Sequence, residues 1–301
     1  MFEGSCVALI TPFKDGAVDE KKLADLVEFQ IANGTSVLVP CGTTGESTTL
    51  SHAEHARVVD FVVKQARKRV LVMAGTGSNS TREAVEMTKH AREAGADGSL
   101  LVVPYYNKPT QRGLVEHFKA IAKAASFPLV VYNIPGRSGV NMLPATVIEL
   151  ARAEKNVVGI KEASGSMDQA SEIIAALGPS FDVLSGDDSL TLPLLAIGAK
   201  GVISVIANIL PKDVAALCAA WKKGDVEGAR AIHLKMFPLI KALFLETNPI
   251  PVKQAAAWMD LCSPEVRLPM TSPETSTCEK LQKAMQAYGG LLSPARKHAA
   301  C

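Results

Sequence analysis

The chain has few aromatic side chains and almost no net charge. Phenylalanine, tryptophan and tyrosine make up 5% of its 301 residues, and the 32 lysines and arginines nearly balance the 30 acidic residues, for a net charge of +2. No block of basic residues with interleaved aromatics occurs, so we do not expect nucleic acid as a partner. No apolar run is long enough to cross a bilayer, so we expect no membrane-spanning helix.

Motifs typical of several other kinds of protein are also missing. The start Met1–Gly4 lacks the basic and then apolar pattern of a signal peptide, so we expect a cytoplasmic protein. His52 and His55 lie three residues apart without an evident third ligand, and no H-E-x-x-H occurs, so a metal site is not expected. The loop Gly75–Asn79 lacks the Gly-Lys-Ser/Thr ending of a phosphate loop, which argues against nucleotide binding.

The cysteines are far apart and include no C-x-x-C pair. They are Cys6, Cys41, Cys218, Cys262, Cys278 and Cys301. Three disulfides are possible in principle, but a chain of this length with a large core does not need them, so we expect reduced thiols. Cys41 lies beside a glycine loop, where a reactive thiol is the alternative to a small core residue.

Apolar, β-rich segments recur along the chain with helical stretches between them. Eight strands are predicted: Val7–Phe13, Val37–Cys41, Val70–Gly75, Ser99–Tyr105, Leu129–Ile134, Val157–Lys161, Val183–Ser185 and Val202–Val205. Strands that alternate with helices indicate parallel βαβ units, and eight units indicate an α/β fold of the (β/α)8 TIM barrel type. A doubly wound open sheet is the alternative, but no G-x-G-x-x-G turn follows the first strand.

Helix signals fill the segments between the strands. Asp19–Asn33 has apolar residues at helical spacing and ends at Asn33-Gly34. Ser51–Glu54 and Ser80–Glu83 are predicted capping boxes. Pro211–Lys223 closes a catalytic barrel predicted to span residues 1–224.

Further helices are predicted beyond the barrel, at Val226–Phe244, Pro251–Leu261 and Pro273–Tyr288. They exceed what a barrel needs, so we predict a C-terminal helical appendage over residues 225–301, used in packing or assembly. Its tail, residues 293–301, is expected to be frayed.

The stretch Val157–Ser164 is a nearly continuous apolar strand with Lys161 close to its C-terminal end. A strand this apolar is usually covered on both faces. Burial disfavours the charged form of lysine, so the pKa of Lys161 should fall. A lysine that loses its proton near neutral pH can attack a carbonyl and form a Schiff base. The alternative is an ordinary lysine that points into water.

Polar groups gather in the loops after the strands, where barrels of this type carry their active sites. Gly42–Glu46 places two hydroxyls between glycines, in a turn that can hold a carboxylate or a phosphate. Three of the four tyrosines, Tyr105, Tyr106 and Tyr132, lie at or near the carboxyl ends of the fourth and fifth strands and could relay protons. Arg137 offers a planar fork suited to a carboxylate.

Together these motifs resemble the dihydrodipicolinate synthase family, the Schiff-base (class I) aldolase barrels that include N-acetylneuraminate lyase. The resemblance covers about residues 1–292 and rests on the motifs Gly42–Glu46, Pro104–Asn107, Tyr132–Arg137, Gly159–Ala163, Leu184–Asp188 and Asn248–Lys253. Sialic acid lyases typically read Gly-Ser-Thr-Gly-Glu and lack the arginine. Thr43-Thr44 and Arg137 therefore favour the synthase branch.

The resemblance implies condensation of pyruvate with L-aspartate 4-semialdehyde to 4-hydroxy-tetrahydrodipicolinate, the first committed step toward diaminopimelate and lysine. Lys161 would form the imine and Tyr132 would act as the general acid and base. Thr44 would relay protons between Tyr132 and Tyr106. In the family the equivalent of Tyr106 reaches in from a neighbouring subunit, which implies a dimer-based homo-oligomer, expected to be a tetramer.

The resemblance also implies the residues that bind the substrates, with no metal or organic cofactor. Thr43 would hold the pyruvate carboxylate and Arg137 the carboxylate of the aldehyde. Gly186 and the backbone of Ile203 would line the pocket.

A second site, for L-lysine as an inhibitor, is implied at the dimer interface. It maps onto Ser47, Thr48, His52, His55, Asn79, Glu83 and Tyr105. Thr48 departs from the alanine expected in strongly inhibited members. Two alternatives stay open: another pyruvate-dependent class I aldolase of the same family, and a barrel that binds a metabolite as a sensor without turnover.

Overall fold

The computed structural model describes residues 1–289 and 291, and its centre is a closed barrel of parallel strands. Around the barrel the strands follow the order β1-β10-β9-β8-β7-β6-β5-β4. Their bounds are β1 (Gly4–Ala8), β4 (Val37–Val39), β5 (Leu71–Gly75), β6 (Gly98–Val102), β7 (Leu129–Asn133), β8 (Val157–Glu162), β9 (Asp182–Ser185) and β10 (Gly201–Ser204). The (β/α)8 barrel predicted from the strand pattern is confirmed.

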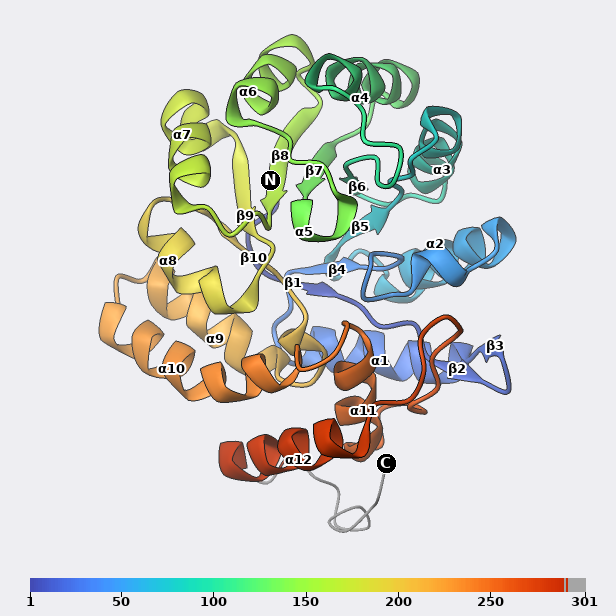
Figure 1. Ribbon diagram of the computed structural model, residues 1–301, viewed down its shortest axis with the longest axis vertical. Helices are drawn as coiled ribbons and strands as arrows, with labels where there is room; N and C mark the ends of the chain where they lie inside the picture. Colours follow the sequence, from blue (N-terminus) through green and yellow to red (C-terminus); the bar gives the residue numbers. More distant parts are fainter. Residues whose placement is uncertain (290, 292–301) are drawn as a thin grey trace.

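Helices surround the strands in a ring that Figure 1 shows from one end of the barrel. They are α1 (Glu20–Ala32), α2 (His52–Ala66), α3 (Thr81–Glu93), α4 (Gln111–Ala125), α6 (Pro144–Ala153), α7 (Met167–Leu177), α8 (Thr191–Ala196) and α9 (Pro211–Lys222). The short helix α5 (Pro135–Ser138) lies inside this ring in the view of Figure 1. Short 3₁₀ turns add η1 (Ser47–Thr49), η2 (Gly178–Ser180), η3 (Asp188–Leu190) and η4 (Ile206–Asn208). A small hairpin of β2 (Phe13–Lys14) and β3 (Ala17–Val18) precedes α1.

Two apolar layers form because successive side chains of each strand point to opposite faces. The larger layer lies between the strands and the helices, and includes Leu38, Leu101 and Ile160. The smaller layer fills the barrel and includes Val39 and Val130. Each strand is therefore buried on both faces, which explains why the strands read as continuous apolar runs.

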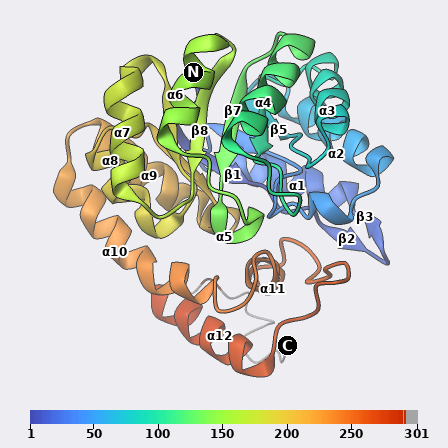
Figure 2. The same ribbon diagram turned by 45° about the horizontal axis from the view of Figure 1, so that its top comes forward.

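Three more helices follow the barrel: α10 (Val226–Ala242), α11 (Ile250–Trp258) and α12 (Thr275–Gly289). Figure 2 shows α10 running beside α9 toward α12, with α11 between α12 and the barrel. All nine residues of α11 are buried, so this helix is enclosed between the barrel and the rest of the appendage. The C-terminal helical appendage is thus present. Its predicted boundary at residue 225 falls at the N-cap of α10, and the tail at 293–301 lies outside the described residues.

Two local predictions are corrected by the structure. The first strand was predicted to reach Phe13, but β1 ends at Ala8 and Phe13 belongs to the separate hairpin. At Ser80 the side chain accepts the N–H of Glu83 as expected, yet the Glu83 carboxylate accepts the hydroxyl of Ser78 instead of closing the box. The capping box at Ser51 is complete in both directions.

The cysteines differ from the prediction at one position. Cys6, Cys41, Cys218 and Cys262 are free and buried, but Cys278 is disulfide-bonded. Burial raises the pKa of the Cys41 thiol, which keeps it protonated and favours the core residue over the reactive thiol. Over residues 1–289 and 291, no helix combines the length and apolar character needed to cross a membrane.

Candidate active site

Lys161 and Tyr132 face each other inside the barrel. Tyr132 on β7 pairs in register with Lys161 on β8. Ile160 packs in the layer toward the helices, so the alternation of the strand points Lys161 inward. Its Nζ lies 4.0 Å from the centroid of the Tyr132 ring. Lys161 is 5% exposed, and within the described part of the chain no carboxylate forms an ion pair with it.

Burial lowers the pKa of Lys161 to about 8, because removal from water disfavours the ammonium ion. The buried carboxylate of Asp188 opposes this shift. Asp188 is itself held by the backbone N–H groups of Val205 and Ile206, each 2.9 Å from its Oδ2. Near neutral pH a useful fraction of Lys161 is therefore the free amine, the form that attacks carbonyls.

The two threonines of the Gly42–Glu46 turn contact different partners. The side chain of Thr43 interacts with the hydroxyl of Tyr132 and acts to lower the pKa of that phenol. The hydroxyl of Thr44 instead accepts a hydrogen bond of 2.9 Å from Nδ2 of Asn248. The relay expected at Thr44 stays a prediction: in the described part of the chain the hydrogen bond of its side chain goes to Asn248 and not to Tyr132. Thr43 is the hydroxyl beside the tyrosine.

Tyr132 stays protonated because burial raises its pKa to about 12. The positive charge of Arg137 and the hydrogen bond with Thr43 act against this rise. A phenol of this kind can donate a proton to a developing oxyanion, and the hydroxyl beside it can return one.

A cavity of about 240 Å³ brings several expected site residues together. Thr43, Tyr132 and Arg137 line it. Arg137 sits in α5, directly after β7, and its Nη2 donates 3.2 Å to the backbone oxygen of Asn248. No acceptor within residues 1–289 and 291 takes the backbone N–H of Thr43 or of Thr44 beside it, so Thr43, which lines the cavity, offers an unfilled donor for a carboxylate.

Gly186 and Ile203 shape the space around Lys161. A Cβ on Gly186 would come within 3.1 Å of Cγ of Lys161 and 2.5 Å of Cβ of Ala163. Only glycine therefore leaves the lysine stem in place. Ile203 belongs to the apolar layer inside the barrel, together with Tyr132.

Tyr106 is placed differently from the other expected catalytic residues. It is 88% exposed and its backbone φ is +73°. It does not line the cavity that holds Thr43 and Tyr132. A left-handed conformation at a tyrosine is unfavourable by itself, and here it holds a large ring out in solvent.

The seven residues expected to hold lysine fall into two groups. Ser47, Thr48 and Tyr105 line the same cavity as Arg137. The other four, His52, His55, Asn79 and Glu83, do not line it.

The contacts of this second group lie within the chain. His55 is buried, with Nε2 2.7 Å from the oxygen of Gly75, and burial lowers its pKa. Asn79 Nδ2 donates 3.2 Å to the oxygen of Tyr105. No group of side chains able to hold a metal occurs among the described residues, so the two histidines do not join a metal cluster there.

Asn248 and Lys253 come from the appendage, and sequence reasoning gave them no role. Nζ of Lys253 lies 2.7 Å from Oε1 of Glu46, with both side chains fully buried. Glu46 ends the threonine turn with φ +53° and also accepts the backbone N–H of Arg267 at 3.1 Å. Asn248–Lys253 was one of the motifs that match the family, so the sequence marked this segment. It did not show that the segment contacts Thr44 and Glu46.

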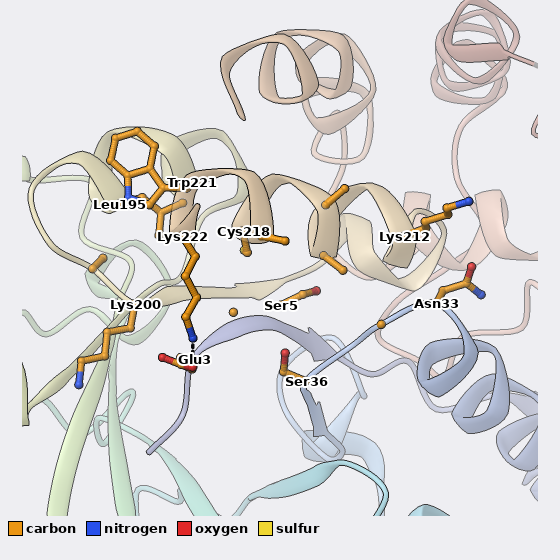
Figure 3. A pocket seen from close by; sticks show the side chains of 16 residues that line it. Glu3, Ser5, Asn33, Ser36, Leu195, Lys200, Lys212, Cys218, Trp221 and Lys222 are labelled. Atoms are coloured by element: carbon orange, nitrogen blue, oxygen red, sulfur yellow. Dashed lines mark hydrogen bonds and ion pairs between the residues drawn. The ribbon is translucent and has the colours of Figure 1, made fainter. Parts of the chain in front are cut away.

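A separate cavity of about 620 Å³ lies near the N-terminal end of β1, between α9 and the barrel (Figure 3). It contains none of the expected site residues. Two of its lysines are already paired: Lys222 with Glu3 at 2.6 Å and Lys200 with Asp182 at 2.5 Å. The third, Lys212, is exposed. This cavity therefore lacks the unpaired buried lysine found at the other end of the barrel.

Comparisons with known proteins agree with the geometry. A 4-hydroxy-tetrahydrodipicolinate synthase from Geotalea uraniireducens is 60% identical over 289 residues, covering 96% of this chain and 99% of the relative. The dihydrodipicolinate synthase structure from Aquifex aeolicus superimposes with a TM-score of 0.96 at 52% identity, covering 97% of this chain and all of that one.

A third relative, from Cyanidioschyzon merolae, was solved with lysine bound. It has a TM-score of 0.93 at 42% identity, covering 96% of this chain and 98% of that one. Residues 1–288 match the sequence profile described as the dihydrodipicolinate synthetase family. Because its barrel and nearly its whole length are matched, this chain belongs to that family.

Proposed function

We propose that this protein condenses pyruvate with L-aspartate 4-semialdehyde to 4-hydroxy-tetrahydrodipicolinate. The observation that carries the proposal is Lys161: a buried lysine without a carboxylate partner, against Tyr132, at the carboxyl end of a barrel strand. Such a lysine can lose its proton near neutral pH and attack a carbonyl to form an imine. Arg137 at the same cavity suits an aldehyde that carries a carboxylate.

The amine of Lys161 attacks the ketone carbon of pyruvate, and loss of water gives a cationic imine. The imine acidifies the methyl group, which loses a proton and becomes an enamine. The enamine carbon attacks the aldehyde carbon, whose oxygen takes a proton. The amine of the second substrate then attacks the imine carbon and expels Lys161 as the ring closes.

Tyr132 is the group proposed to move protons in these steps, with Thr43 as the hydroxyl that exchanges protons with it. Tyr106, exposed in a single chain, would complete the relay in a neighbouring subunit of a dimer-based homo-oligomer. We assign the pyruvate carboxylate to the free N–H groups of Thr43 and Thr44 and to the hydroxyl of Thr44. We also propose that the protein is cytoplasmic and that L-lysine inhibits it by binding where Ser47, Thr48 and Tyr105 line the cavity.

Arg137→Ala tests the choice of aldehyde. Removing the guanidinium should raise the KM for L-aspartate 4-semialdehyde by about 10²-fold, the scale of a lost charge-assisted pair. Formation of the pyruvate adduct should be unchanged. Measuring both quantities separates this enzyme from another pyruvate-dependent aldolase: an unchanged aldehyde KM would contradict the proposed second substrate.

A further inference from the structure

One residue of the appendage touches both groups that we assign to substrate carboxylates. Asn248 lies in the connection between α10 and α11 and is 4% exposed. Its Nδ2 donates to Oγ1 of Thr44 at 2.9 Å. Its backbone oxygen accepts from Nη2 of Arg137 at 3.2 Å. No other residue joins these two groups through hydrogen bonds in the described part of the chain.

These contacts decide which protons remain for a ligand. Because the oxygen of Thr44 accepts from the amide, the hydroxyl proton of Thr44 is left to donate. The backbone oxygen of Asn248 takes one N–H of Arg137, and the rest of the planar fork stays available. Asn248 thus leaves both side chains with protons to donate, which is the polarity that a carboxylate needs.

The turn that carries Thr44 is held by a second contact from the appendage. Lys253 in α11 forms the buried ion pair with Glu46, two residues after Thr44. The hydroxyl of Thr11 donates to the oxygen of Gly45 at 2.7 Å. The backbone of the turn is therefore fixed on both sides, so the orientation of the Thr44 hydroxyl depends on the amide of Asn248 and not on movement of the turn.

We propose that Asn248 is a positioning residue of the reaction: its amide orients the Thr44 hydroxyl as a donor to the pyruvate carboxylate, while its backbone oxygen sets the place of Arg137. The inference rests on the proposed function and adds to it a specific task for the appendage. A side-chain substitution removes only the first contact, because the backbone oxygen remains. Its effect should therefore fall on pyruvate and spare the aldehyde.

Asn248→Ala and Asn248→Asp test this assignment. Loss of the amide in Asn248→Ala should raise the KM for pyruvate about 10-fold. In Asn248→Asp a carboxylate would accept the Thr44 proton and place a negative charge beside the ligand, so the pyruvate KM should rise about 100-fold. The KM for the aldehyde, and kcat at saturating pyruvate, should stay within about twofold of the unsubstituted protein.

Asn156→Ala is the matched control. Its amide donates to the oxygens of Ala122 and Phe127, at 2.9 and 3.1 Å, just before β8 and away from the site. This variant should lower the melting temperature at least as much as Asn248→Ala, because it loses two hydrogen bonds, and leave both KM values unchanged. Steady-state kinetics and thermal unfolding of all four proteins give the comparison.

Three results would overturn the inference. If both Asn248 variants lose only thermal stability and keep the pyruvate KM, Asn248 is a structural residue of the junction. If both KM values rise together, the residue holds the whole cavity and not Thr44. If the unsubstituted protein itself does not turn over the two substrates, the proposed function fails, and the assignment of Asn248 fails with it.

Discussion

Lys161 inside the barrel and Lys253 in the appendage are both buried lysines that face an aromatic ring. The Nζ of Lys161 lies 4.0 Å from the ring centre of Tyr132, and that of Lys253 lies 4.2 Å from the ring centre of Phe13. They differ in their ion pairs: Lys253 is paired with Glu46, whereas no carboxylate of the described residues forms an ion pair with Lys161. Burial lowers the pKa of both; Glu46 acts against the shift at Lys253 through the ion pair, and Asp188 acts against it at Lys161 without one.

Burial alone therefore does not make a lysine reactive. A buried ammonium with a carboxylate partner keeps its proton and joins two parts of the chain. A buried ammonium without one is destabilised and gives up its proton more easily. The same side chain therefore holds the threonine turn in one place and serves as the proposed nucleophile in the other.

Breaking the pair at Lys253 should give the largest loss of stability. Lys253→Met leaves the Glu46 carboxylate buried without a partner, and the free energy of unfolding should fall by about 4 kcal/mol. Urea denaturation measures the change. The double variant Lys253→Met with Glu46→Gln removes the stranded charge and should recover most of the loss. If the double variant is no more stable than the single one, the ion pair is not what matters there.

Removing the ammonium of Lys161 should instead raise the free energy of unfolding. At pH 7 the folded protein holds a lysine with a pKa of about 8 in place of an ordinary value of 10.5. Each pH unit of that difference is worth about 1.4 kcal/mol, so Lys161→Met should be about 3 kcal/mol more stable while losing activity.

The pH dependence of that gain follows from the direction of the shift. The unfolded chain binds the extra proton between pH 8 and pH 10.5, so the stability of the unsubstituted protein rises over this range. The advantage of Lys161→Met should therefore be complete below pH 8 and vanish near pH 10.5. Urea denaturation at pH 7 and at pH 10.5 checks both values. A variant less stable than the unsubstituted protein at pH 7 would contradict the account.

Tyr132→Phe separates the ring near Lys161 from its hydroxyl. The ring keeps the lysine buried, so the pyruvate adduct should still form, but kcat should fall about 10²-fold because the proton donor is gone. Thr43→Val should give a related loss that does not add to that of Tyr132→Phe, since the two hydroxyls contact each other. Thr44→Val should chiefly raise the pyruvate KM. If kcat falls in Thr44→Val and not in Thr43→Val, then Thr44 and not Thr43 is the hydroxyl that relays protons with Tyr132.

The smallest effect expected is the pH dependence of imine formation. With pyruvate in excess, the rate of adduct formation should rise about tenfold per pH unit below pH 8 and level off above it, because only the free amine of Lys161 reacts. The profile is measured by reducing the imine with borohydride at fixed times, at pH values from about 6 to about 10, on both sides of the pKa of about 8. A midpoint near 10.5 would mean that Lys161 is not desolvated.

Much of the fold was predictable because short apolar runs that alternate with helical stretches at regular intervals are typical of parallel βαβ units. The end of the first strand was not, since Leu9 and Ile10 are as apolar as the strand itself, yet they lie beyond its last ladder pair at Ala8. Lys161 was recognisable from the apolar residues before it and from the family motif around it.

The partners of the site residues were harder to predict. Thr43 and Thr44 are chemically alike, so their sequence could not tell which hydroxyl meets Tyr132. Glu46 and Lys253 are separated by 207 residues, and no local pattern pairs a turn after the second barrel strand with a helix of the appendage. Such contacts depend on tertiary packing, which spacing along the chain does not report.

The most direct test of the account is to trap the pyruvate adduct. The purified protein is mixed with pyruvate, reduced with borohydride and digested, and the modified peptide is found by mass spectrometry. A single adduct is expected on Lys161, absent in Lys161→Ala, with Lys253 unmodified because its amine is fully buried and paired with Glu46. No adduct, or an adduct on another lysine, would contradict the claim that the unpaired buried lysine is the nucleophile.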